Sequence, residues 1–405
     1  MKFTPAVTSV LALSLASTAA LANGTAVGAA PAPAATSSTS WMDDVVTQNS
    51  TQPNIAPSFN WQNRVTVGGN INFDGRYGSR GVGITPFSSS SSGSDESAIY
   101  LNNGNVFVDA DVNQYIKAHV DVAYLDNQFT TFAAENTGSS FNLDEAYVTL
   151  SDFNSLPYYA RVGRMYTPFG HYDDPYPLQY SLTQLLEQVN GNTAEVGFVT
   201  PMGLYGDAFA FDGRHSTSTG TRIDNFGGKI GFTSSMNGAK FDGNVSYLSD
   251  MRAVDYTASV FGGSATSYSS SLNRTEGLAA HIDGSTGPFG LYGDYVTALG
   301  GLGFAQTNVN NGSALDTHAW AYDVGGTYSF DTMAYPSSFG VAWDQAKNAA
   351  FLSMPTYRIM ANYTVSPWKY TDVSLLYSYD KDFDTADGGT DKGSDTVAGR
   401  LAVHF

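Results

Sequence analysis

Two histidine–aspartate pairs are the residues whose types and spacing come nearest to a catalytic arrangement. His119 with Asp121 and His281 with Asp283 each follow the order His-x-Asp. On a strand this spacing puts both side chains on one face, where an imidazole could act as a general base and the carboxylate could orient it. Residues two apart on a strand are about 7 Å apart, too far for direct contact unless the side chains lean together. No nucleophilic serine is tied to either pair by a motif, so the sequence favours ordinary polar lining over an enzyme.

Four aspartates near the carboxyl terminus have the spacing of calcium ligands. In "DKDFDTADGGTDKGSD", Asp380, Asp382, Asp384 and Asp391 stand at positions 1, 3, 5 and 12 of such a loop. Position 6 is Thr385, where a calcium loop needs glycine for its sharp turn, and no helical pattern flanks the segment. A solvated hairpin loop fits better, and weak divalent-ion binding near lipopolysaccharide phosphates is the alternative. We expect no resident metal and no cofactor.

The composition points to elements that are strands rather than helices. The chain has 405 residues, of which 42% are hydrophobic and only 14% charged, with 42 Gly, 25 Tyr and 24 Phe. Beyond residue 22 no apolar run is long enough to cross a membrane as a helix, and the apolar residues alternate with polar ones instead. Cysteine is absent from the sequence, so neither a disulfide framework nor a lipid-anchoring cysteine is expected. We expect no nucleic-acid partner.

The first part of the chain predicts export. Residues 1–22 combine Lys2, an apolar stretch and Ala20-Leu21-Ala22 before Asn23, which is the pattern of a cleaved signal peptide. Residues 23–63 include "GTAVGAAPAPAATSSTS", which has no pattern that could bury a core, and predict a flexible periplasmic segment. The third unit, residues 64–405, carries the alternating pattern.

In residues 64–405, segments of roughly ten residues with period two are separated by turn residues, the signature of a transmembrane antiparallel β-barrel. We count about sixteen strands, and an even number returns both chain ends to the periplasmic side. Their ranges are 64–76, 98–112, 114–125, 141–150, 158–166, 194–200, 203–212, 225–234, 240–249, 275–284, 289–298, 318–330, 338–347, 356–366, 370–382 and 396–405.

The connections between these strands alternate in length. "YGSRGVGITPFSSSSSGSDE" is long, whereas "TPM", "SSMNGA", "GSTGP" and "SPWK" fall in the short positions. Long loops outside and short turns in the periplasm are typical of outer-membrane barrels, while a soluble sandwich or propeller has little reason to alternate so regularly.

The polar face of each strand predicts the lining of a pore. The apolar face of the first strand should contact lipid; it carries Val65, Val67, Ile71 and Phe73. The charged residues are assigned to the lumen, because a charge on the lipid face would cost roughly 2–4 kcal/mol at mid-depth. The expected pore-lining and selectivity residues include more acids than bases among the strands, which favours cations. They are Arg64, Asp74, Arg76, Asp109, Asp111, Lys117, His119, Asp121, Arg161, His281, Asp283, Asp294, Asp323, Asp344, Arg358 and Arg400, with Asp173, Asp174 and Glu187 added from a loop.

That loop lies between the fifth and sixth strands and contains its own helical pattern. In "LQYSLTQLLEQV", Leu178, Leu182, Leu185, Leu186 and Val189 have helical spacing. We expect this short helix either to fold into the lumen as a constriction or to pack on the outer rim. In the first arrangement its apolar side rests on the inner wall, and Gln184, Glu187 and Gln188 face the solute.

The chain ends with "DTVAGRLAVHF", whose alternation predicts a last strand with Val397, Leu401 and Val403 toward lipid. Phe405 is similar to the terminal aromatic residue that the barrel-assembly machinery reads in outer-membrane proteins. Tyr328, Trp343, Tyr363, Tyr377 and Tyr379 are suited to aromatic girdles at the two interfaces. Membrane lipid, lipopolysaccharide and the assembly machinery are the expected partners, and the oligomeric state is left open.

The segment "ARVGRMYTPFGHYDDPY" carries a family resemblance. Gly163-Arg164 and Thr167-Pro168-Phe169-Gly170 resemble the G-[RK]-x-x-x-P-F-G element of porins of the LbtU-type siderophore family and, more distantly, of the phosphate-selective type. The resemblance implies an outer-membrane channel that passes a small solute, an iron–siderophore complex. With 19 basic against 37 acidic residues, the chain departs from the phosphate-selective type. The alternative function is a surface barrel that acts in adhesion or envelope organisation with little transport.

Overall fold

The computed structural model describes residues 59–61, 64–79, 96–125, 140–153, 155–171, 176, 178–212, 223–236, 238–262, 274–302 and 318–405. The predicted signal peptide, most of the predicted periplasmic segment, and Asp173 and Asp174 lie outside the described residues. The predicted periplasmic segment, residues 23–63, contains one short strand, β1 (Phe59–Trp61).

Within the described residues, seventeen strands form one antiparallel sheet, and sixteen of them, β2 to β17, close into a barrel. Each of these pairs with its neighbours in the chain, and β17 pairs with β2 to complete the circle. The predicted fold class and strand number are therefore confirmed. The strands are β2 (Val65–Gly78), β3 (Glu96–Asn113), β4 (Ile116–Leu125), β5 (Ser140–Ser151), β6 (Tyr158–Tyr166), β7 (Asn190–Val199), β8 (Leu204–Asp212), β9 (Ile223–Met236), β10 (Ala239–Leu248), β11 (Gly277–Thr286), β12 (Phe289–Ala298), β13 (Trp320–Thr332), β14 (Tyr335–Lys347), β15 (Tyr357–Trp368), β16 (Thr371–Lys381) and β17 (Gly393–His404).

The seam of the barrel is completed by β1. Strand β17 covers β2 from Gly78 back to Asn70, and β1 pairs with Val65, Thr66 and Val67 on the same strand. The edge of β2 beyond the end of β17 is thus paired as well, which matters because an open sheet edge in lipid leaves unsatisfied backbone groups.

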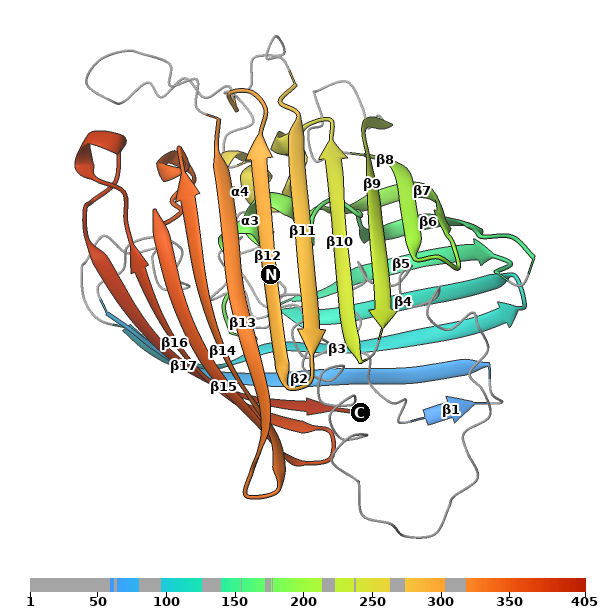
Figure 1. Ribbon diagram of the computed structural model, residues 1–405, viewed down its shortest axis with the longest axis horizontal. Coiled ribbons are helices and arrows are strands. Elements are labelled where there is room, and N and C mark those ends of the chain that lie inside the picture. The colour runs from blue at the N-terminus through green and yellow to red at the C-terminus, as the bar shows by residue number, and fades with distance from the viewer. Residues whose placement is uncertain are drawn as a thin grey trace.

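Short turns gather at one end of the barrel and long connections at the other. The turn between β13 and β14 is made by Met333 and Ala334, both with positive φ, and Gly287 and Gly238 serve the turns between β11 and β12 and between β9 and β10. In Figure 1 the strands of the front wall, β10 to β13, run steeply across those of the back wall, β2 to β5, as strands tilted to the axis of a barrel must.

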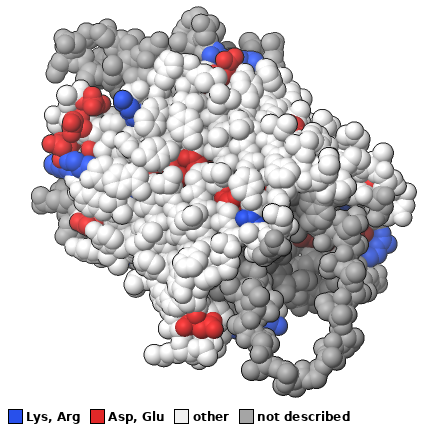
Figure 2. Space-filling model, in the orientation of Figure 1, with Lys and Arg blue, Asp and Glu red and all other residues white. Residues whose placement is uncertain are grey.

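The outer face is apolar and carries two rows of aromatic rings. Near the long connections Trp320 lies beside Tyr295 and Tyr322, and near the short turns Tyr328 lies beside Phe289 and Phe330. Ten residues separate Trp320 from Phe330 on β13, roughly 33 Å along the strand. At a tilt of about 40° this corresponds to roughly 25 Å of height, the thickness of the apolar band of a membrane barrel. Figure 2 shows few charged residues on the broad face, most of them toward its rim.

Helices are short and lie within the connections. In the described part of the chain they are α3 (Leu182–Glu187), η2 (Met251–Ala253), α4 (Asp255–Gly262), η3 (Ala350–Leu352) and η4 (Thr385–Asp387). Among the described residues, none of these helices has the length and apolarity needed to cross a bilayer. Figure 1 shows α3 and α4 behind the front strands, within the outline of the barrel.

The apolar core sits inside the barrel, toward the end with the long connections. Its largest cluster joins residues of α3, η2 and α4 to inward-facing small and aliphatic side chains at the ends of the strands, among them Leu248, Ala298 and Ala321. A second cluster packs Tyr176 and Leu178 against Ala342, Met360, Leu376 and Ala398 of the wall. The interior of the barrel is therefore partly filled by its own connections.

Candidate functional site

The element that carries the family resemblance, Gly163 to Gly170, forms the bend from β6 into the barrel interior. Gly163 has φ +143° and Gly170 has φ +76°, backbone conformations that favour glycine. A Cβ on Gly163 would overlap the backbone of Ala146 and Tyr147, and one on Gly170 would overlap the side chain of Glu187. Phe169 is completely buried in the apolar cluster. The glycines are thus required by close packing, which gives the motif a structural cause.

The described residues between 167 and 189 (167–171, 176 and 178–189), here called the infolded segment, lie inside the barrel. Helix α3 begins after Ser181, whose side chain accepts a hydrogen bond from the backbone N–H of Gln184. Every residue of α3 is buried, and the helix packs against β12, β13, β14 and α4. Of the two arrangements predicted for this helix, the structure has the one in the lumen, and the outer-rim arrangement is wrong.

Three wall residues bind the backbone of the infolded segment. Arg76 of β2 donates to the carbonyl of Leu178, and Arg358 of β15 donates through Nη1 to the carbonyl of Tyr180 at 2.7 Å. The N–H of Leu182 donates to Asp344 Oδ2 of β14 at 3.2 Å. Arg76 is on the first strand of the barrel, and Asp344 and Arg358 are on two neighbouring strands near its end, so the segment is held from both sides of the closing seam between β17 and β2.

The turn at the start of the segment is anchored on the opposite side of the barrel. Lys229 of β9 donates to the carbonyl of Gly170 at 2.8 Å, and the N–H of Gly170 donates to Ser246 Oγ of β10 at 2.9 Å. Glu187 accepts from the N–H of His171 at 3.0 Å, which ties the end of α3 back to this turn.

The polar side of α3 does not face a solute path as the sequence predicted. Gln184, Glu187 and Gln188 are 2%, 1% and 3% exposed. Gln184 Nε2 donates to Gln188 Oε1 at 3.1 Å, so the two side chains bind each other on the helix. The prediction was wrong because a second connection, which contains η2 and α4, packs on the same helix through α4, and because the bend at Gly170 lies against Glu187. Sequence reasoning missed this second segment; Asp250, whose carboxylate caps η2 by accepting from Arg252 N–H, was its one local signal.

Several of the charges expected to line a pore are buried in ion pairs. Arg161 forms two hydrogen bonds with Glu195 Oε2, at 2.9 and 2.6 Å. Arg400 binds both oxygens of Asp74 at 2.7 Å, and Arg358 binds both oxygens of Asp380 at 2.6 and 2.9 Å. The alternation in the sequence predicted that the arginines and Asp74 face the interior, but it did not predict which acid each arginine binds. Because bidentate pairs neutralise opposite charges locally, these arginines do not form an open basic track.

The remaining predicted residues lie nearer the short-turn end or within the wall. Arg64, Asp111 and Lys117 are exposed there, and Arg64 donates to the carbonyls of Asp111 and Val112. His119 is buried and lies 2.8 Å from Asp109, whose side chain is 43% exposed. Asp121 accepts from Asn105 at 2.7 Å, and Asp323 accepts from Tyr292 at 3.2 Å.

A second histidine cluster lies where the infolded segment meets β11 and β12. His281 Nδ1 is 2.6 Å from Asp294 Oδ1, and its Nε2 is 3.2 Å from Asp283 Oδ1. The two side chains of this His-x-Asp pair therefore lean together, which the spacing alone argued against. The ring of His171 stacks on that of His281, with centroids 3.6 Å apart. Burial, together with the adjacent His281 and Lys229, lowers the pKa of His171 well below its usual value.

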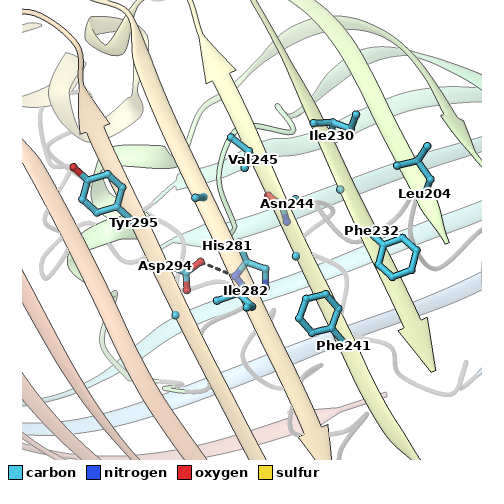
Figure 3. Close-up of a pocket in the computed structure, with 14 residues that line it drawn as sticks. Leu204, Ile230, Phe232, Phe241, Asn244, Val245, His281, Ile282, Asp294 and Tyr295 are labelled. Atoms are coloured by element: carbon cyan, nitrogen blue, oxygen red, sulfur yellow. Dashed lines mark hydrogen bonds and ion pairs between the residues drawn. The ribbon is translucent and has the colours of Figure 1, made fainter. Parts of the chain in front are cut away.

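The outer side of the same wall is apolar. Figure 3 shows His281 and Asp294 among aliphatic and aromatic side chains of β8 to β12 that border a depression of about 590 Å³. Ile282 and Tyr295, their neighbours in sequence, are 54% and 43% exposed, whereas His281 and Asp294 are both 4% exposed. The polar pair therefore points into the barrel, and the depression belongs to the lipid-facing side.

Two of the aspartates with calcium-like spacing, Asp382 and Asp391, bind groups of their own loop. Asp382 accepts hydrogen bonds from the N–H groups of Phe383 and Thr390, at 2.8 and 2.7 Å. Asp391 pairs with Lys381 at 2.6 Å, and this contact lowers the pKa of Asp391. The carboxylates are spread over different donors, which agrees with a hairpin loop.

Sequence comparison finds UPF0422 proteins. No family model matches the chain. It is 27% identical over 353 residues to the UPF0422 protein lpl2888 of Legionella pneumophila (strain Lens), covering 79% of this chain. A UPF0422 protein of Coxiella burnetii is 22% identical over 309 residues, covering 74% of this chain. The chain spans 63% of the length of these curated relatives.

Structural comparison finds porins. The outer-membrane channel DcaP of Acinetobacter baumannii matches with a TM-score of 0.56 and 14% identity, over 86% of this chain and 100% of that one. The anion-selective porin from Comamonas acidovorans matches with a TM-score of 0.54 and 12% identity, over 84% of this chain and 99% of that one. OmpF of Salmonella typhi has a TM-score of 0.56 and 11% identity, over 84% and 97%. The chain thus has the fold of porins of the Gram-negative outer membrane, and its apolar outer belt suits that location.

Proposed function

We propose that the protein is an outer-membrane channel for small polar solutes, in which the infolded segment sets the passage. The observation that carries this proposal is the binding of that segment to the inner wall through Arg76, Arg358 and Asp344. A connection held inside a barrel by buried charged groups narrows the interior at a fixed place. A connection packed on the outer rim would leave the interior of the barrel at its full width.

The solute we propose is an iron–siderophore complex, taken up without an energy-coupled plug domain. Support comes from the resemblance of Gly163-Arg164 and Thr167 to Gly170 to the siderophore-porin element. The described barrel of sixteen strands uses residues 65–404, and its interior is occupied by connections between strands. The expected partners are lipid, lipopolysaccharide and the barrel-assembly machinery.

One observation favours the second candidate, a surface barrel with little transport. The large apolar cluster joins α3, η2 and α4 to the wall in the half of the barrel near the long connections. Apolar packing of this extent could hold the passage too narrow for a solute of siderophore size. Adhesion or organisation of the envelope would then be the role of the long connections.

Single-channel recording separates these functions. The purified protein in a planar bilayer should show steady open steps, and replacing residues 178–189 with a short Gly-Ser bridge should raise the conductance. The barrel should still assemble, because its backbone hydrogen bonds are made between strands. The matched control removes residues 385–390 from the connection that holds η4, outside the infolded segment, and should leave conductance unchanged. Absence of open steps in both the native protein and the bridge variant would favour the surface-barrel role.

A siderophore preference needs its own measurement. Liposomes containing the native protein should take up a ferric siderophore faster than an uncharged oligosaccharide of similar size. The bridge variant should pass both at similar rates, because the discriminating segment has been removed. Equal rates through the native protein would contradict the siderophore assignment and leave a general channel.

A further inference from the structure

We propose that His171, His281 and Asp294 form a binding site for a first-row divalent metal ion such as Zn²⁺, which would join the infolded segment to the barrel wall. The ligand atoms of these three residues lie within 4.8 Å of one another. They come from three parts of the chain, the bend after β6, β11 and β12. The site is independent of which solute the channel carries.

The donor atoms converge at distances close to those of a metal site. Asp294 Oδ1 is 2.6 Å from His281 Nδ1 and 4.0 Å from His171 Nδ1. Tetrahedral ligands 2.0–2.1 Å from a zinc ion are roughly 3.4 Å apart, between these two values. The stacked rings, inclined by 17°, have to turn so that both lone pairs aim at one point. His171 lies on a connection rather than a strand, so its ring can make this adjustment.

Two polar atoms of the cluster have no other use among the described residues, and one of them is the second oxygen of Asp294 rather than the Oδ1 that lies 2.6 Å from His281. His171 Nδ1 and Asp294 Oδ2 are buried, and neither has a hydrogen-bond partner there. The Asp294 side chain is only 1% exposed, so its unused oxygen is withheld from bulk water. A buried carboxylate oxygen with no donor is costly, and a metal ion would satisfy it.

A second carboxylate, that of Asp283, contacts the other ring nitrogen of His281. If Nδ1 binds the metal, the proton must be on Nε2, which lies 3.2 Å from Asp283 Oδ1. Metal-binding histidines commonly donate their other N–H to a carboxylate, which fixes the tautomer and raises the basicity of the ring. The proton now between Nδ1 and Asp294 leaves when the metal takes its place. The Asp283 side chain is 42% exposed.

A competing set shares His281 but is less suited to such an ion. Asp242 and Asp283 also gather around His281. One oxygen of Asp242 already accepts from Tyr205 at 2.8 Å, and the set offers one imidazole instead of two. Imidazole suits zinc, copper, nickel and iron, whereas carboxylates alone suit harder ions, so the two-histidine set is favoured. Lys229 nearby opposes a cation, but Asp242, Asp283 and Asp294 outnumber it.

Isothermal titration of untagged protein in detergent with ZnCl₂ tests the site. We expect one ion per chain, with the dissociation constant raised at least tenfold by His171→Ala, His281→Ala or Asp294→Asn, and about 10–100-fold by Asp283→Asn. His119→Ala is the matched control, because His119 also pairs with an aspartate but belongs to no such cluster among the described residues. Cobalt should give the visible absorption of a tetrahedral site in native protein and lose it in His171→Ala.

The substitution of His171 lies on a connection, so it remains informative if a strand variant fails to assemble. Zinc binding that is undiminished by His171→Ala and Asp294→Asn would overturn the site and, if it were lost in Asp242→Asn, would assign the ion to the competing set. Absence of zinc binding by the native protein would also overturn it. Neither result bears on conductance, so the channel function is tested separately.

Discussion

Phe405 and Gly69 exchange both of their backbone hydrogen bonds, at 2.9 and 3.0 Å, at the point where the last strand of the barrel meets the first. A Cβ built on Gly69 would lie 2.7 Å from Cζ of the Phe405 ring, so the ring packs directly over this glycine. The aromatic residue that the sequence marked as an assembly signal is thus also a closing contact of the barrel.

Removal of Phe405 should therefore impair closure. We expect several-fold less heat-modifiable barrel in the outer membrane, because the deletion opens part of the β2 edge. Gly69→Ala should also impair closure, because its Cβ would overlap both the backbone carbonyl of Asn105 on β3 and the ring of Phe405. Gly75→Ala is the matched control, since a Cβ at Gly75 on the same strand meets its nearest atom at 3.9 Å. Normal assembly without Phe405 would argue against a closing role.

The Arg358 anchor should control the infolded segment. Arg358→Met leaves Asp380 buried without its partner and releases the carbonyl of Tyr180. Breaking a buried ion pair costs about 3–5 kcal/mol, so we expect lower resistance to denaturant, together with larger or noisier open-channel currents.

A second ion pair provides the control for Arg358. Arg161→Met breaks the buried pair with Glu195, in which neither residue belongs to the infolded segment. It should lower stability to a comparable degree and leave the current steady. If both variants change the current alike, general loosening of the barrel explains the result, and the specific role of the Tyr180 contact is lost.

Strand positions could be predicted from the sequence far better than the contents of the barrel. Period-two alternation located strands such as β6 and β12 to the residue, because each strand has one apolar and one polar face. The start of β7 was missed, since "NGN" reads as a turn, yet Asn190 is paired in β7 and its side chain contacts Asp144. The anchors were not predictable. Arg358 binds a backbone carbonyl 178 residues away, and a carbonyl has no sequence signature.

Ion selectivity should be weaker than the overall charge suggests. The acids Asp74, Asp380 and Glu195 are neutralised by arginines, whereas Asp109 and Asp283 are 43% and 42% exposed. We expect a modest cation preference at low salt that fades near 1 M, where the Debye length is about 3 Å. Reversal potentials in a salt gradient measure it, and Asp109→Asn should reduce it. A clear anion preference would support the phosphate-selective type instead.

The bend at Gly170 offers a test that separates backbone strain from packing. Gly170→Ala places an L-residue at φ +76°, which costs about 1–2 kcal/mol, and its Cβ would also overlap Glu187. Gly238→Ala imposes nearly the same φ, +81°, but its Cβ has nothing within 4 Å. If the contact with Glu187 holds α3 in place, only Gly170→Ala should destabilise the infolded segment, seen as broadened conductance levels with unchanged barrel assembly. Equal behaviour of the two variants would mean that strain alone matters, and Glu187 would then have no role in holding the bend.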